Sequence, residues 1–157
     1  MRQAPVVPSG VAQPASCPLC EADGGVLVVR LPDCRVIRAQ EPGFPAFYRV
    51  VLAAHVAEWT DLDEPAQWAL MRVVNTVERS LRERLCPTKI NLAAMGNVVP
   101  HLHWHVIARF DWDSHFPAPV WSQALRDVSP HHLAALNERM AEVDQLIAQR
   151  LQPDTVV

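Results

Sequence analysis

Three histidines alternate with apolar residues in the second half of the chain, at positions His101, His103 and His105. Successive side chains of a β-strand point to opposite faces, so a strand over 101–110 directs all three imidazoles to one side. Leu102 and Trp104 point to the other side, and their size indicates that this side packs against a hydrophobic core. The segment therefore predicts a sheet with one face in the core and one face carrying histidines.

A single metal ion shared by all three histidines is disfavoured by distance. A rise of about 3.3 Å per residue separates the Cα atoms of His101 and His105 by about 13 Å. Zinc–nitrogen bonds are only about 2.0–2.1 Å long, although neighbouring pairs at i and i+2 can share an ion. The spacing favours a division of roles, in which the middle imidazole, His103, is a nucleophile or base. Its neighbours then orient it and meet negative charge.

The remaining hydrophobic pattern predicts an α+β domain with a largely antiparallel sheet covered by helices. A long helix capped by Asp61 or Asp63 ends before Pro87, and a second helix occupies 129–151. The predicted strands are residues 26–30, 35–39, 46–53, 89–94 and 101–110.

Composition restricts the partners and the compartment. The chain has 157 residues, the length of one domain. Its 14 Lys and Arg against 17 Asp and Glu give a charge of −3, which provides no basic field for a nucleic-acid partner. No apolar run reaches the roughly 20 residues of a membrane helix, so we expect no membrane partner. Residues 1–16, broken by prolines, predict a flexible tail without a signal peptide. We therefore expect a cytoplasmic protein.

A cysteine pair, Cys17-Pro-Leu-Cys20, has the spacing of a zinc knuckle, and reduced thiols are the rule in the cytoplasm. Tetrahedral zinc needs two further ligands. The candidates for them are His55, His101, Cys34 and Cys86. The alternative is that the pair only packs beside the N-terminal tail. We predict that Cys34 and Cys86 are buried small hydrophobic residues.

The segment His101-Leu-His-Trp-His-Val-Ile107 resembles the signature of the histidine triad (HIT) family, a histidine and a hydrophobic residue repeated three times with one more hydrophobic residue. The segment 89–100 resembles the strand and turn that precede this signature in bacterial members. The resemblance covers about 17–121. It implies a HIT-like fold, with a five-stranded sheet, a long central helix and a C-terminal helix. We expect a HIT domain over 17–128, with the helix 129–151 packed on it.

The resemblance also implies an activity, because family members are nucleotide hydrolases and transferases. Their second triad histidine attacks the α-phosphate, and water or another acceptor resolves the nucleotidyl-histidine. Here His103 would be the nucleophile, His105 would help hold the α-phosphate, and His101 would orient the site or bind zinc. The expected substrate is a diadenosine polyphosphate, a nucleoside phosphoramidate or a similar conjugate. The family also implies a homodimer.

Two other classes of function stay open. A metal-dependent enzyme could use two of the strand histidines as catalytic ligands, but no carboxylate accompanies them at ligand spacing. A nucleotide-binding regulatory module would keep the pocket with little turnover, since a fold alone does not define an activity.

Bacterial members with a cysteine pair imply a structural zinc site in this chain. They use the Cys-x-x-Cys pair, a histidine after the third strand and the first triad histidine. The corresponding residues are Cys17, Cys20, His55 and His101. We expect no organic cofactor.

Two segments depart from the family pattern. Many members have a longer glycine-rich loop ending in Gly-Gln, where this chain has Gly96-Asn97. The Asn97 amide and the backbone N–H groups around Gly96 can still meet a phosphate, and Asn91 is a weaker candidate for ribose or phosphate. The segment 111–121 differs from the nucleoside-phosphoramidase branch. It either closes over the site, with His115 near phosphate, or is an ordinary surface loop.

Overall fold

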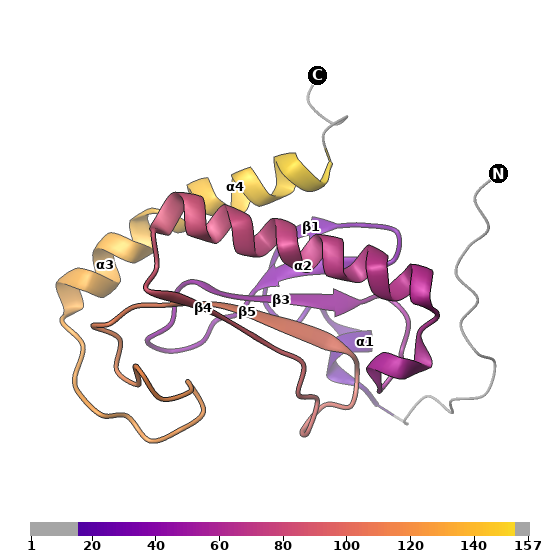
Figure 1. Cartoon of the computed structure of the whole chain (residues 1–157), viewed down its shortest axis with the longest axis horizontal. Helices are drawn as coiled ribbons and strands as arrows, with labels where there is room; N and C mark the ends of the chain where they lie inside the picture. Colours follow the sequence, from indigo (N-terminus) through magenta and orange to yellow (C-terminus); the bar gives the residue numbers. More distant parts are fainter. Residues whose placement is uncertain (1–15, 153–157) are drawn as a thin grey trace.

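A five-stranded antiparallel sheet, with strand order β1-β2-β3-β5-β4, forms the centre of the computed structural model. The helices α2 and α4 lie along one face of it, and α1 lies on the opposite side (Figure 1). The structure describes residues 16–152, so the predicted tail lies almost entirely outside the described residues. The strands are β1 (Val26–Arg30), β2 (Cys34–Arg38), β3 (Phe47–Leu52), β4 (Lys89–Ala93) and β5 (His103–Arg109). The helices are α1 (Pro18–Glu21), the short 3-10 helix η1 (Trp59–Asp61), α2 (Glu64–Leu85), α3 (Pro130–Glu138) and α4 (Met140–Leu151).

The pairing of β3 with β5 separates the two faces of the sheet. Trp104 lies opposite Val50 on the face covered by helices, and His105 lies opposite Arg49 on the other face. The helix-covered face holds the main core, which includes Val50 and Val106, both fully buried. The predicted separation of a core face from a histidine face is confirmed, because the side chains of β5 alternate as the sequence pattern requires.

The helix α2 is set by local signals that the sequence carries. The Asp63 side chain accepts a hydrogen bond of 2.9 Å from the Ala66 backbone N–H, which caps the first turn. At the other end, Cys86 adopts a left-handed conformation with φ of 47° and ends the helix before Pro87. The inward face of α2 is apolar at helical spacing. Its buried hydrophobic residues are Leu70, Val74, Val77, Leu81 and Leu85.

A partly buried polar contact fixes α4 against the sheet. The Tyr48 hydroxyl donates a hydrogen bond of 2.7 Å to Asp144 of α4, and Arg38 pairs with the same carboxylate at 3.0 Å. Burial raises the pKa of Tyr48 far above its usual value, so the hydroxyl keeps the proton that it donates. The C-terminal helix is thus held on the core face and leaves the histidine face clear.

Three predictions about local structure were wrong. β5 begins at His103, not His101, because the backbone turns here: His101 N–H bonds to the Val99 carbonyl and Leu102 N–H to the Val56 carbonyl. The predicted helix 129–151 is divided at Arg139, whose N–H bonds three residues back, as in a tighter 3-10 turn. Cys34 is buried as predicted, whereas Cys86 is exposed at the end of α2.

Within residues 16–152, no helix combines the length and the apolar character needed to cross a membrane.

Candidate active site and metal centre

The three histidines are nearly inaccessible to solvent although they lie on the face away from α2. His101 is fully buried, while His103 and His105 are only 8% and 5% exposed to solvent. The rings of His103 and His105 meet at an angle of 72° with centroids 4.8 Å apart. The predicted placement on one strand face therefore holds for His103 and His105, whereas His101 lies in the turn before β5 and its ring packs on His55.

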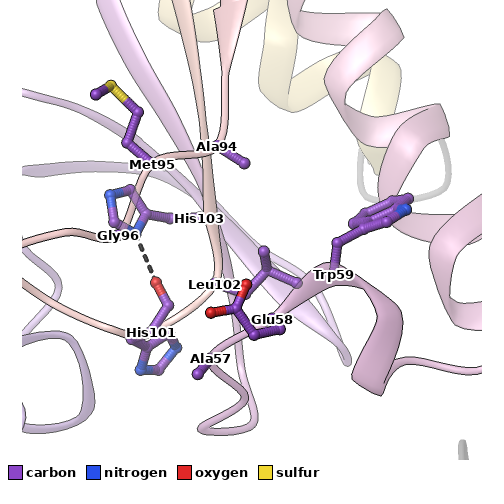
Figure 2. Close-up of a pocket in the computed structure, with 9 residues that line it drawn as sticks. All are labelled: Ala57, Glu58, Trp59, Ala94, Met95, Gly96, His101, Leu102 and His103. Atoms are coloured by element: carbon purple, nitrogen blue, oxygen red, sulfur yellow. Dashed lines mark hydrogen bonds between the residues drawn. The ribbon is translucent and has the colours of Figure 1, made fainter.

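Hydrogen bonding fixes which nitrogen of His103 carries the proton. Its Nδ1 lies 2.6 Å from the backbone carbonyl oxygen of His101, as Figure 2 shows. A carbonyl only accepts, so Nδ1 must donate and therefore holds the hydrogen. The lone pair of the neutral ring then lies on Nε2, which has the electrons that a nucleophile requires.

Burial keeps His103 and His105 in the neutral form. Loss of hydration lowers the pKa of His103, and the charge of Arg49 lowers it further. Burial, followed by the charges of His103 and Arg49, lowers the pKa of His105 to about 3. Nδ1 of His105 is buried without a hydrogen-bond partner in the described part of the chain.

An open pocket with about 330 Å³ of empty space adjoins His103 (Figure 2). It lies between the turn that precedes η1 and the turn that follows β4. Gly96 lines it beside His103, and its φ of +65° is the conformation that favours glycine in such a turn. The other lining residues are Ala57, Glu58, Trp59, Ala94, Met95, His101 and Leu102.

Of the three residues predicted to contact the substrate, only Gly96 lines the pocket. Gly96 lies in the pocket, while Asn97 is exposed and Asn91 lies on β4, and neither asparagine is among the residues that line the pocket. The side-chain oxygen of Asn91, Oδ1, accepts a hydrogen bond of 2.7 Å from Arg109 Nη1, so this atom is occupied by a buried arginine. The Asn91 NH₂ group is the part that can still meet a ligand.

The segment after β5 covers His105 through Trp121, which the sequence did not single out as a site residue. The indole lies against the His105 ring with centroids 5.2 Å apart, and Phe47 packs on the same imidazole at 5.4 Å. His115 instead packs on Phe44 at 5.3 Å. The segment 111–121 thus lies over His105, and the Trp121 indole makes the contact.

A buried ion pair holds this segment in place. Asp113 accepts hydrogen bonds from Arg109 Nε at 2.8 Å and from Nη2 at 2.9 Å. Arg109 Nη2 also donates to the Ala118 carbonyl at 2.9 Å. Arg109 and the Asp113 hydrogen bonds lower the pKa of the Asp113 carboxyl against the opposing effect of burial, so the pair is ionised.

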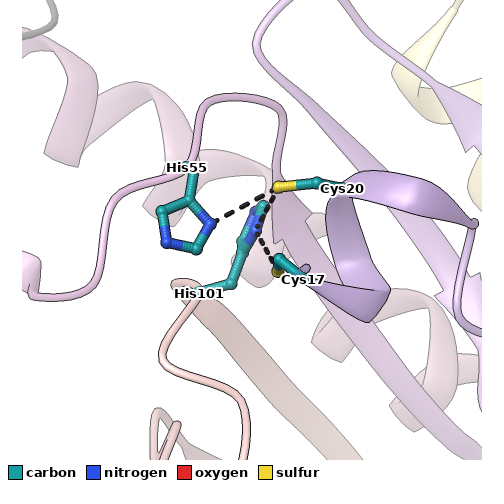
Figure 3. A group of neighbouring side chains, drawn as sticks. All are labelled: Cys17, Cys20, His55 and His101. Carbon is teal, nitrogen blue, oxygen red and sulfur yellow. Dashed lines mark hydrogen bonds between the residues drawn. The ribbon is translucent and has the colours of Figure 1, made fainter. Parts of the chain in front are cut away.

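The four predicted metal ligands come together at the end of the sheet (Figure 3). The potential ligand atoms of Cys17, Cys20, His55 and His101 all lie within 4.8 Å of one another. His101 Nδ1 is 3.5 Å from Cys17 Sγ and 3.4 Å from Cys20 Sγ. Tetrahedral zinc with bonds of about 2.0–2.3 Å separates its ligand atoms by roughly 3.3–3.8 Å. The four residues can therefore hold a metal ion such as zinc.

Two further features prepare this metal centre. His101 Nε2 lies 2.8 Å from the Leu52 carbonyl oxygen and must donate to it, so the lone pair on Nδ1 faces the cysteine sulfurs. The buried Arg35 donates to the Leu19 and Ala22 carbonyls at 2.7 and 3.0 Å, which fixes the turn that carries both cysteines. Arg35 was missed in the sequence, where the only signal is a charge inside an apolar strand.

The structure is thus an α+β protein whose sheet has one helix-covered face and carries two buried, neutral imidazoles on the other, with His103 lining a pocket. The match to a family model is specific: residues 23–112 match the HIT domain. This chain belongs to the HIT domain family, whose members are in general nucleotidyl hydrolases and transferases.

Solved structures agree with this membership. The histidine triad protein blr8122 from Bradyrhizobium japonicum is 31% identical, with a TM-score of 0.61, over 76% of this chain and 90% of that one. A histidine triad protein from Sinorhizobium meliloti is 27% identical, with a TM-score of 0.63, over 80% of this chain and 89% of that one. A zinc-bound histidine triad family protein from Mycobacterium smegmatis shares the fold at 17% identity and a TM-score of 0.59, over 88% and 96% of the two chains. No curated protein matches this chain.

Proposed function

We propose that this protein hydrolyses a nucleotide conjugate at its α-phosphate through a covalent nucleotidyl-histidine on His103. The observation that carries the proposal is the bond from His103 Nδ1 to the His101 carbonyl, which leaves Nε2 with a lone pair beside a pocket. His105 adds a neutral imidazole whose Nδ1 has no hydrogen-bond partner within the described residues and which can donate to a phosphate oxygen. The family match supports nucleotide chemistry.

The reaction would proceed in two displacements at phosphorus. Nε2 of His103 forms a bond to the α-phosphorus as the bond to the leaving group breaks, and the leaving group takes the bonding electrons. A phosphate leaving group departs as an anion, and an amine leaving group takes up a proton from solvent. The His103 proton stays on Nδ1, hydrogen-bonded to the His101 carbonyl, so the phosphorylated ring is cationic and is itself a good leaving group. Water then attacks phosphorus and loses a proton to solvent, while the Nε2 electrons return to the ring. The products are a nucleoside monophosphate and the released group.

The substrate would be a dinucleoside polyphosphate such as a diadenosine polyphosphate, or a nucleoside phosphoramidate. Gly96 backbone N–H and the Asn97 amide are the proposed contacts on the leaving-group side, with Asn91 NH₂ as a further one. In this proposal His101 has two tasks, because its carbonyl orients His103 and its Nδ1 faces the metal centre.

We further propose that Cys17, Cys20, His55 and His101 bind a structural zinc ion. The spacing of their ligand atoms supports this, as does the zinc-bound relative from Mycobacterium smegmatis. When bound, zinc would cross-link the N-terminal turn, the end of β3 and the start of β5. Homodimer formation, which the family implies, is a separate proposal that sedimentation equilibrium tests.

Turnover on a panel of dinucleoside polyphosphates and adenosine 5′-phosphoramidate tests the activity. His103→Ala should lose turnover on every substrate that the wild type cleaves, whereas His131→Ala, which removes an exposed imidazole from α3, should keep it. Unchanged turnover in His103→Ala would overturn the proposal. Nucleotide binding with no turnover in the wild type would favour a binding module.

A further inference from the structure

Arg49 places a positive charge on the histidine face of the sheet, and its Nε donor has no acceptor there within the described residues. It lies on β3 directly opposite His105 in the strand pairing, so the two side chains are neighbours on one face. Its Nε is buried and has no hydrogen-bond partner among residues 16–152. The Glu41 carboxylate lies 3.9 Å from Arg49 Nη2, which is within ion-pair distance but beyond hydrogen-bond distance.

The two buried arginines among residues 16–152, Arg35 and Arg109, have their donors satisfied by the protein. Arg109 has both Asp113 oxygens, Asn91 and a carbonyl as acceptors, and Arg35 has three backbone carbonyls. An unpaired buried donor costs free energy, and Arg109 and Arg35 avoid this cost. Among the described residues Arg49 Nε shares it with Trp104 Nε1, which lies on the helix-covered face, and with His105 Nδ1, which lies on the same face as Arg49. Such a donor on the face that carries the active site indicates an acceptor supplied by a ligand.

The surroundings of Arg49 favour an anionic acceptor. The guanidinium carbon lies 5.4 Å from the centroid of the Phe47 ring, and the same ring packs on His105 at 5.4 Å. Phe47 therefore supports both side chains from one side. A guanidinium presents planar N–H donors that match phosphate oxygens, and it stays charged when partly buried.

We propose that Arg49 binds a non-bridging phosphate oxygen of the nucleotide, as a second contact beside His105. This role rests on the proposed function and deepens it, because it adds a cation to a phosphate site otherwise made of neutral imidazoles and amides. It predicts that the phosphate group, and not the nucleoside, supplies the affinity that depends on Arg49.

Calorimetric titration with AMP and with adenosine tests this division. Arg49→Gln should weaken AMP binding by at least about tenfold, the effect expected for a lost charged hydrogen bond. Adenosine binding should stay unchanged. Arg49→Lys, which keeps the charge but lacks the Nε donor, should lose less affinity for AMP than Arg49→Gln. Arg79→Gln is the matched control, since it removes the same charge from the exposed side of α2 and should leave both titrations unchanged.

Two results would overturn the role of Arg49: unchanged AMP affinity in Arg49→Gln, or an equal loss for AMP and adenosine, which would indicate a nucleoside contact. Thermal unfolding reports whether each variant is folded. If Arg49→Gln does not fold, Arg49→Lys decides by the same comparison. Failure of the proposed function is distinct, because the wild type would then not bind AMP and would form no adduct on His103. Such a result would remove the nucleotide role of Arg49 as well.

Discussion

Replacing Asp113 by asparagine removes one charge from the most deeply buried ion pair of the described structure. Asp113 and Arg109 are 2% and 1% exposed. The carboxylate accepts two hydrogen bonds from Arg109. It also accepts three backbone N–H bonds, at 3.2, 2.9 and 2.7 Å, from Phe110, His115 and Phe116. An asparagine has one acceptor oxygen in place of two, and its NH₂ group would face donors.

The expected loss of stability follows from the charge left behind. Breaking a buried pair by removing one partner costs about 3–5 kcal/mol. Arg109 keeps its bonds to the Asn91 side chain and the Ala118 carbonyl, which places Asp113→Asn near the lower end, at about 3 kcal/mol. The same substitution should loosen the segment that carries Trp121 over His105.

Urea unfolding followed by tryptophan fluorescence measures this free energy. Glu142→Gln is the matched control: its partner Arg84 lies 2.9 Å away, but both side chains are about half exposed, so the change should be far smaller. A loss below about 1 kcal/mol in Asp113→Asn would refute the reasoning, because it would mean that the pair is not desolvated as the structure indicates.

Three further outcomes are expected. Cys20→Ser should abolish zinc binding in metal analysis and lower the melting temperature, while Cys86→Ser should keep the metal. Equal zinc content in the two variants would contradict the assigned ligands. In metal-free protein, stability should fall as the pH drops below about 6.5 towards 3. In this pH range the His105 ring binds a proton in the unfolded chain but not in the folded protein, where its pKa is lowered. In His105→Gln, the melting temperature measured by thermal unfolding should therefore depend less steeply on pH. Trp121→Ala should raise the pKa of His105 in an NMR titration, since it uncovers the ring; an unchanged pKa would mean that Trp121 does not desolvate it.

Local patterns made much of the fold predictable. The alternation from His101 to Val106 set both faces of β5, and Asp63 with Pro65 set the start of α2, because each signal acts within a few residues. The backbone turn at His101 was missed because two hydrogen bonds hold it. The His101 backbone N–H bonds to the Val99 carbonyl, and the His101 imidazole Nε2 bonds to the carbonyl of Leu52, which is distant in the sequence. A strand pattern by itself does not report such contacts.

Part of the candidate site was also predictable from the sequence, and part was not. Cys17 and Cys20 were predicted from their spacing, with His55 and His101 among the candidates for the other two ligands. The family resemblance selected these two histidines, and the structure brings all four residues together. The role of Trp121 was not predicted, because its contact with His105 depends on how a segment without a periodic pattern folds back over the sheet.

Arg49 was missed for a related reason. It was placed within a strand candidate, but only the register between β3 and β5 sets it beside His105. Periodicity predicts which face a side chain occupies, and it does not predict which residue lies across the ladder. The unpartnered Nε could be found only from the folded structure.

Trapping of the covalent intermediate tests the central claim most directly. The protein would be incubated with a diadenosine polyphosphate, quenched at alkaline pH, digested and analysed by mass spectrometry for an adenylate on the peptide that contains the three histidines. The proposed mechanism predicts an adduct on His103 that is absent from His103→Ala and present in His131→Ala. Turnover of the substrate without any adduct on His103, or an adduct that persists in His103→Ala, would contradict it.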